Sequence, residues 1–190
     1  MERVTEIRWH GRGGQGVVTA AKLLAESALE QDKYFQAMPE YGAERMGAPI
    51  QAFTRIGDQP IDLHCNITNP NIVVVLDQTL LGTISVAQGL TDDGVVLINS
   101  GRSPKEIRSD LGIAHGKVYS VDATQIALDT IGKPIPNTPM LGALIKVTGM
   151  INLDTVLDHL KKSFGKKFAQ ELIDANVNAV RRAYEEVASE

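Results

Sequence analysis

Cysteine is almost absent from this sequence, and its scarcity excludes several kinds of chemistry. The 190 residues include one cysteine, Cys65, so the chain cannot form an internal disulfide. An iron–sulfur cluster bound by this chain alone is also excluded, because such clusters need several thiolates. Cys65 lies in an alternating, strand-like stretch, and we expect it to be a small buried residue rather than a nucleophile.

Long apolar runs and a strong charge imbalance are missing as well. No apolar stretch approaches the length that spans a bilayer, so we expect no membrane association. Glu2 and Glu6 near the start argue against a targeting peptide, and together with the single thiol they predict a cytoplasmic protein. The net charge of -4 gives no reason to expect nucleic-acid binding. The four histidines show no metal-ligand spacing, so we expect no metal site.

The patterns that are present predict one α/β domain over residues 1–190. Hydrophobic residues make up 43% and charged residues 22%, which are globular values. Strands are predicted at 5–9, 34–38, 50–56, 61–67, 72–77, 95–98 and 118–121. Helices are predicted from residue 17 and at 79–88, 105–111, 123–131, 137–148, 153–164 and 167–188, with Thr138 as a cap. The expected fold is a three-layer, open, mostly parallel, Rossmann-like sheet with helices on both faces, an antiparallel edge and a helical C-terminal segment.

A glycine-rich turn stands between the first predicted strand and the first helix. It contains Gly11, Arg12, Gly13, Gly14, Gln15 and Gly16. Glycines let the backbone approach an anion, and the first N–H groups of the helix point toward it. We therefore predict a phosphate-bearing cofactor here, with Arg12 or Gln15 close by. Alternatively, the glycines only permit a tight turn and close helix–sheet packing.

A nicotinamide-type reading of this motif has a weakness. The acidic residue that would hold a ribose should end the next strand, but that strand ends in Pro39, and Glu40 follows the proline. The segment 40–49 is rich in glycine, proline and charge, which is typical of a loop shaped for a partner or ligand. Its candidate site residues are Glu40, Tyr41, Gly42, Glu44 and Arg45. No catalytic residue can be named, since the sequence has neither a P-loop lysine nor a nucleophile elbow.

Four motifs together resemble the gamma subunit of 2-oxoacid:ferredoxin oxidoreductases, in the pyruvate and 2-ketoisovalerate branch. These are His10–Gly16, Pro39–Arg45 with Gly47–Pro49, Val74–Asp77 with Leu80 and Leu81, and Asn137–Leu144. They occur in the same order and cover nearly the whole chain. Met46 departs from the pattern, because many relatives carry a second arginine there.

The resemblance implies a non-catalytic subunit of an oxidoreductase that converts a 2-oxoacid to an acyl-CoA and passes electrons to ferredoxin. It implies that this chain binds no cofactor alone, and that the complex uses thiamine diphosphate, magnesium, iron–sulfur clusters and coenzyme A. The implied partners are thiamine-binding alpha and beta subunits and a ferredoxin-like delta subunit. The gamma part would help to close the active site and form the coenzyme A path. Two alternatives stay open at this point: a free-standing nicotinamide or flavin reductase, and a purely structural assembly domain.

Overall fold

A seven-stranded mixed sheet forms the centre of the molecule in the computed structural model, which describes residues 4–39, 46–165 and 167–190. The strand order is β2-β3-β1-β4-β5-β6-β7. The strands are β1 (Thr5–Arg12), β2 (Tyr34–Pro39), β3 (Pro49–Gly57), β4 (Ile72–Val75), β5 (Val95–Asn99), β6 (Lys117–Val121) and β7 (Ala188–Ser189). The four strands β1, β4, β5 and β6 run parallel, while β2, β3 and β7 pair antiparallel. The predicted parallel centre with an antiparallel edge is confirmed.

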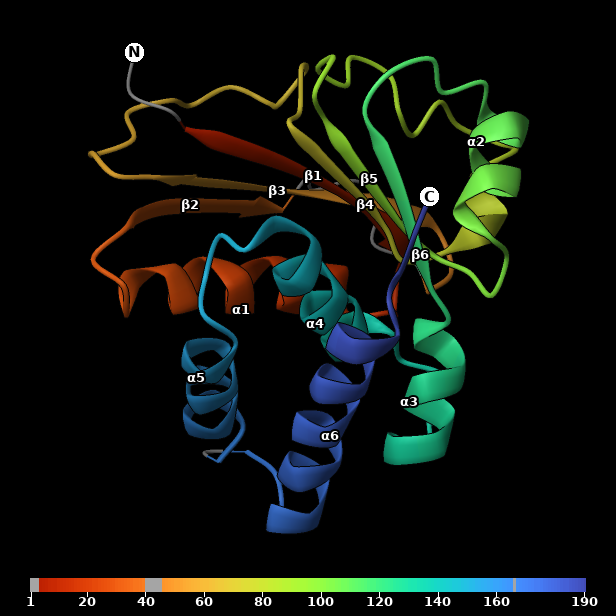
Figure 1. The fold of residues 1–190 in the computed structure, drawn as a ribbon. Coiled ribbons are helices and arrows are strands. Elements are labelled where there is room, and N and C mark those ends of the chain that lie inside the picture. The colour runs from red at the N-terminus through yellow and green to blue at the C-terminus, as the bar shows by residue number, and fades with distance from the viewer. Residues whose placement is uncertain (1–3, 40–45, 166) are drawn as a thin grey trace.

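Helices cover both faces of this sheet (Figure 1). Within the described ranges they are α1 (Val17–Leu29), α2 (Pro104–Leu111), α3 (Ala123–Ile131), α4 (Asn137–Thr148), α5 (Leu153–Gly165) and α6 (Gln170–Glu186). Helices α1, α3, α4 and α6 bury one face, and α5 packs outside them on α1 and α6. The second face carries α2 and the irregular segment 76–94.

Side-chain alternation along the strands explains the two-faced core. On β1, Ile7 and Trp9 face the larger helical cluster, while on β4 and β5 successive apolar residues alternate between the two clusters. Strands buried on both faces need such continuous apolar runs. Trp9 is fully buried and donates its indole N–H to Thr54 Oγ1 at 3.0 Å.

The predicted helix over 79–88 is wrong. A short 3₁₀ turn, Gln78–Leu80, and a series of further turns take its place. Asp77 accepts from the backbone N–H of Thr79 at 2.9 Å and so caps only this turn. Farther along, the guanidinium of Arg8 donates to the carbonyls of Val86 and Gln88. These carbonyls are satisfied by a side chain from β1 rather than by a helix.

The predicted strand over 61–67 is also wrong, and the segment is irregular. Arg55, which is 1% exposed, donates to the carbonyls of Leu63 at 3.3 Å and Cys65 at 2.8 Å, so this backbone is bound by a side chain. Cys65 is exposed rather than buried. The antiparallel partner of β3 on this side is β2 instead.

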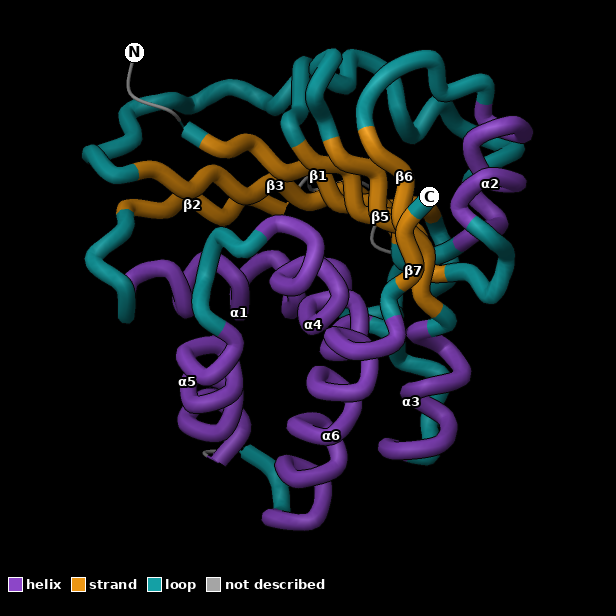
Figure 2. Tube along the Cα trace, viewed as in Figure 1, coloured by secondary structure: helices purple, strands orange, loops and turns teal. Residues whose placement is uncertain are grey.

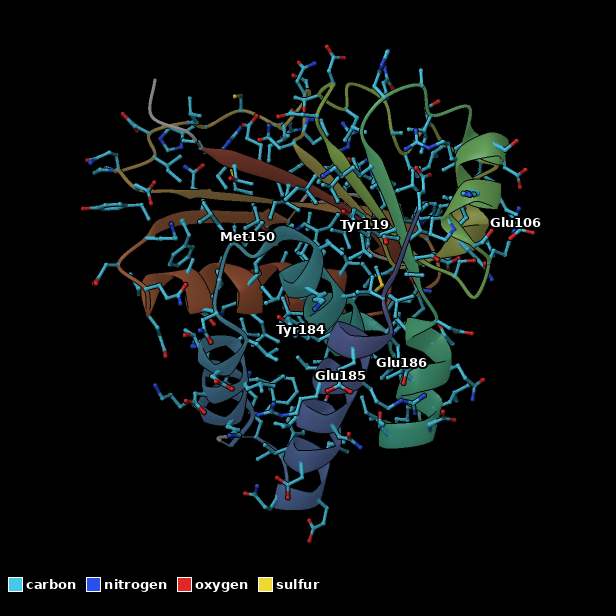
Figure 3. The ribbon with its side chains drawn as sticks, viewed as in Figure 1. Glu106, Tyr119, Met150, Tyr184, Glu185 and Glu186 are labelled. Atoms are coloured by element: carbon cyan, nitrogen blue, oxygen red, sulfur yellow. The ribbon has the colours of Figure 1, made fainter. Side chains whose placement is uncertain are left out.

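Two predictions about the C-terminal helices need correction. The hydroxyl of Thr138 donates to Asn176 Oδ1 at 2.8 Å, joining α4 to α6, and Thr138 does not cap α4. The last helix begins at Gln170 rather than 167, and it ends at Glu186. The chain then becomes extended, and β7 pairs with β6, with Ser189 opposite Tyr119. Figure 3 labels Tyr119 on β6.

Candidate functional site

The glycine-rich turn lies at the carboxyl end of β1, where α1 begins. Gly16 adopts φ +78° directly before α1, and a Cβ there would lie 2.4 Å from Asn137 Nδ2. Gly14 has φ +94°, which also favours glycine. A Cβ on Gly11 would lie 2.4 Å from Val17 Cγ2, so the strand and helix approach too closely for a side chain. These glycines are required by the turn itself, whatever it binds.

Gln15 fixes the turn to the end of the neighbouring strand. Its Oε1 accepts from the backbone N–H of Arg12 at 2.8 Å, and its Nε2 donates to Asp77 Oδ2 at 2.7 Å. Asp77 follows β4, which runs parallel to β1. In open parallel sheets, ligands bind beside the carboxyl ends of the strands, and the turn lies at such an end.

Arg12 takes part in the same network. It donates from Nε and Nη2 to Thr79 Oγ1 at 3.1 and 2.9 Å and from Nη1 to the carbonyl of Gly47 at 3.1 Å. Its Nε also lies 3.3 Å from Asp77 Oδ2. Thr79 in turn donates its hydroxyl to Asp77 Oδ1 at 2.6 Å. The charge of Arg12 is therefore shared with Asp77, and the side chain keeps an exposed fraction of 29%.

The carboxyl group of Asp77 is held in its ionised form. Burial raises its pKa, but hydrogen bonds from Thr79 and Gln15 and the positive charge of Arg12 outweigh burial, so the pKa lies below its ordinary value. An ionised Asp77 can accept from all three neighbours at once. The network is thus a stable support for the turn at neutral pH.

His10 and Arg8 form a buried pair on the face opposite α1. His10 is 2% exposed, and its Nε2 accepts from Arg8 Nε at 3.2 Å. Its Nδ1 has no hydrogen-bond partner in the described part of the chain. Burial, and then the charge of Arg8, lowers the pKa of His10 to about 4. His10 is therefore neutral at pH 7.

A cavity of 490 Å³ opens beside the turn, between α1, the α3–α4 connection and the start of α6. Gly14 and Gly16 line one end of it. Much of its wall is apolar, formed by Val18, Leu23, Ile131, Ile135, Phe164, Phe168 and Leu172. Three lysines also line it: Lys22, Lys133 and Lys167.

The charges around this cavity are unbalanced. Lys22 pairs with Glu26 at 3.5 Å, whereas Lys133 and Lys167 have no carboxylate partner within residues 4–39, 46–165 and 167–190. We refer to this cavity as the lysine groove. No sequence pattern points to this groove, because its lysines come from three segments that only the fold brings together.

The second predicted site segment is only partly visible. Glu40, Tyr41, Gly42, Glu44 and Arg45 lie outside the described residues. The residues that follow them contact the glycine turn. Gly13 donates its N–H to the carbonyl of Ala48 at 2.9 Å, and Gly47 donates to the carbonyl of Gly13 at 3.1 Å. The structure thus brings residues 47 and 48 of the second motif against the glycine turn, at the carboxyl end of β1.

Within the described ranges, no group of three or more His, Cys, Asp or Glu side chains is arranged to hold a metal ion. None of the described helices has the length and apolar character needed to cross a membrane.

Comparisons with known proteins agree on one family. The family model for pyruvate ferredoxin/flavodoxin oxidoreductase matches residues 6–186. The chain is 54% identical to pyruvate synthase subunit PorC of Thermotoga maritima over 182 residues, covering 96% of this chain and 94% of that protein. It is 48% identical to the pyruvate/ketoisovalerate oxidoreductases common subunit gamma of Pyrococcus abyssi, covering 95% of each.

A solved structure agrees with this assignment. The crystal structure of pyruvate oxidoreductase subunit PORC from Thermotoga maritima superimposes with a TM-score of 0.88 at 49% identity, covering 99% of each chain. The chain therefore belongs to the pyruvate ferredoxin/flavodoxin oxidoreductase family, as its resemblance to the gamma subunits predicted.

Proposed function

We propose that this chain is the gamma subunit of a complex that oxidises pyruvate or a branched-chain 2-oxoacid to an acyl-CoA and reduces ferredoxin. The names of its relatives, pyruvate synthase and pyruvate/ketoisovalerate oxidoreductase, support this substrate class. Thiamine diphosphate with magnesium and the iron–sulfur clusters would be bound by alpha, beta and ferredoxin-like delta partner subunits. These cofactors would supply the decarboxylation and electron-transfer chemistry. A free-standing nicotinamide or flavin reductase is not favoured by these similarities.

The role of this chain in the complex is to bind coenzyme A at the glycine turn and in the lysine groove. The observation that supports this role is that two features meet in one cavity: Gly14 and Gly16 before α1, and two lysines, Lys133 and Lys167, that have no carboxylate partner among the described residues. Helix starts and lysines both attract phosphates, and the apolar wall suits the adenine and pantetheine parts.

The residues of the turn have a supporting role in this proposal. Gln15, Arg12 and Asp77 bond to one another and hold the turn open toward the groove, so their side chains need not contact the ligand. A fixed turn loses little conformational freedom when the ligand binds. We propose further that Glu40, Tyr41, Gly42, Glu44 and Arg45 contact the thiamine-binding partner, since residues 47 and 48 return directly to the turn.

The test is the apparent affinity for coenzyme A of the reconstituted complex. In the double variant Lys133→Gln with Lys167→Gln, the KM for coenzyme A is expected to rise about tenfold, because two phosphate contacts are lost. The KM for pyruvate should stay unchanged. Lys105→Gln is the matched control, since Lys105 is an exposed lysine on α2, outside the groove. An unchanged KM for coenzyme A in the double variant would refute the coenzyme A role.

Substrate choice has its own test. A second carboxylate on the oxoacid calls for an extra arginine, and the residue after Arg45 in this chain is Met46 rather than a second arginine. We expect viologen reduction by the complex to be faster with pyruvate or 2-ketoisovalerate than with 2-oxoglutarate. A preference for 2-oxoglutarate would contradict the substrate class and leave the family assignment intact.

A further inference from the structure

The two edges of the sheet differ in their protection. At one edge, β7 pairs with β6, and Glu190 forms an ion pair with Arg108 at 2.6 Å. At the other edge lies β2, whose principal neighbours in the described part of the chain are β3 and α1 (Figure 2). Strand edges carry unpaired N–H and C=O groups, which proteins usually shield with charges, bulges or a covering element. The sequence of β2, YFQAMP, contains no charged residue, and its pairing with β3 is continuous.

A second cavity, of 330 Å³, runs beside β2. Its lining comes from α1, β2 and β3 and is mainly apolar: Val18, Ala21, Phe35, Ala37, Met38, Pro39 and Ala52. The charged residues of the lining are Lys22 and Glu26, which form an ion pair with each other at 3.5 Å. This groove therefore has no net charge, unlike the lysine groove, and it suits an uncharged occupant.

We infer that an extended, uncharged, apolar segment of another subunit adds to β2 as an eighth strand. The backbone groups on the outer edge of β2 would bond to that segment, and every second side chain of the segment would enter the groove beside α1. This inference rests on the proposed function, because it requires a partner subunit. It goes further by giving the geometry of one contact and the chemistry of the partner segment.

A second copy of this chain fits the edge less well than a different strand. Antiparallel pairing of β2 with its own copy would include Pro39 from each chain, and each proline lacks a backbone donor. A different segment meets only one such proline. In addition, α1 lines the groove along β2, so two copies would have to fit two helices there.

Hydrogen exchange of the complex, compared with the chain alone, tests the inference. The outward-facing amides among residues 34–38 should exchange at least about tenfold more slowly in the complex, because they gain partners, whereas the amides that face β3 should change less. The substitution Ala37→Lys places a charge in the groove and should abolish this slowing and weaken assembly. Leu128→Lys is the control, since Leu128 is an apolar residue on α3 that is 42% exposed and far from β2 in sequence. Thermal unfolding of both variants as single chains checks that each folds.

The outcomes separate the two proposals. If the complex forms and residues 34–38 exchange as they do in the chain alone, strand addition is refuted and the proposed function stands. If slowing appears in the chain alone and grows with its concentration, the occupant is a second copy and the inference is wrong. If the native chain associates with no partner subunit, both the inference and the proposed function fail.

Discussion

The two faces of the sheet are covered by different kinds of structure. On one face, α1, α3, α4 and α6 pack apolar side chains against the strands. On the other face, segment 76–94 has little regular structure, and its carbonyls at residues 86 and 88 are bound by a buried arginine from β1. Both faces bury apolar side chains, but the second face depends in addition on polar groups that must find partners. The same sheet therefore responds to different substitutions on its two sides.

Close packing is most evident between α4 and α6. A Cβ on Gly142 of α4 would lie 2.1 Å from the carbonyl oxygen of Val180 on α6, so the two backbones are in direct contact. Near the C-terminal end of α4, Lys146 Nζ lies 4.8 Å from the ring centre of Tyr184, which Figure 3 labels on α6. This pair of helices carries the C-terminal part of the core.

The largest effect is expected from Gly142→Ala on the helical face. Alanine favours a helix over glycine by about 1 kcal/mol. The added methyl group meets backbone, which cannot rotate away, so we expect a net loss of about 4 kcal/mol in the free energy of unfolding. Urea unfolding measures it. Gly165→Ala is the control, because a Cβ at the end of α5 meets nothing within 4 Å. Equal stability of the two variants would contradict the packing argument.

The next effect tests the opposite face. Arg8→Met removes the guanidinium that donates to the carbonyl of Val86, in a buried bond, and to that of Gln88, in a partly buried one. We expect a loss of about 3 kcal/mol, less than for Gly142→Ala because the variant also removes a buried charge. Proteolysis should begin within residues 81–90 in this variant and not in Gly142→Ala. If protease cleaves Arg8→Met and Gly142→Ala at the same sites, the two faces do not respond differently to substitution and the comparison is wrong.

The pH dependence of stability gives a smaller effect on this same face. His10 has a pKa of about 4 in the folded chain against 6.5 ordinarily, because burial disfavours its charged form. Below pH 6.5 the unfolded chain therefore binds a proton that the folded chain does not, and stability falls until about pH 4. Between pH 7.5 and pH 5 this group should cost about 2 kcal/mol. Urea unfolding of His10→Gln should lack this component, whereas His64→Gln, at an exposed histidine, should keep it.

The smallest effect is expected at the border of the irregular segment. Ser100 follows β5, and its hydroxyl donates to Gln78 Oε1 at 2.9 Å. Ser100→Ala removes this bond and the one that the buried hydroxyl accepts from the backbone N–H of Arg102 at 3.2 Å. Both bonds are neutral, so we expect a cost of about 1 kcal/mol. Calorimetry can measure the change in melting temperature. A loss as large as that of Arg8→Met would mean that this face depends on many bonds equally rather than on one arginine.

Much of the fold could be predicted because its local signals agree with the tertiary structure. The apolar run of β4 and the start of α2 at Pro104 were both predictable for this reason, and the structure adds Ser103 as the cap of α2. The failures have a common physical cause. At 61–67 and 79–88, buried arginines from β3 and β1 bind the backbone, and nothing in the local pattern reveals a donor that comes from another strand.

The candidate site was predictable only in part. The glycine turn can be recognised in the sequence, because its glycines cluster between a predicted strand and a predicted helix. The hydrogen bond from Gln15 to Asp77 forms only because β1 and β4 are neighbours in the sheet. The order of the strands in the sheet could not be predicted from the sequence. Lys133 and Lys167 stand in unremarkable segments, and only the packing of α6 against α4 brings them to the same cavity as Gly14.

The pair of backbone hydrogen bonds between Gly13 and residues 47 and 48 has a consequence for evolutionary change in this family. These bonds use main-chain atoms only, so side chains at positions 46 and 48 can be exchanged without loosening the junction. Met46 is 88% exposed and can vary freely in this respect. Side chains at these positions can thus vary next to the glycine turn while the start of α1 keeps its position.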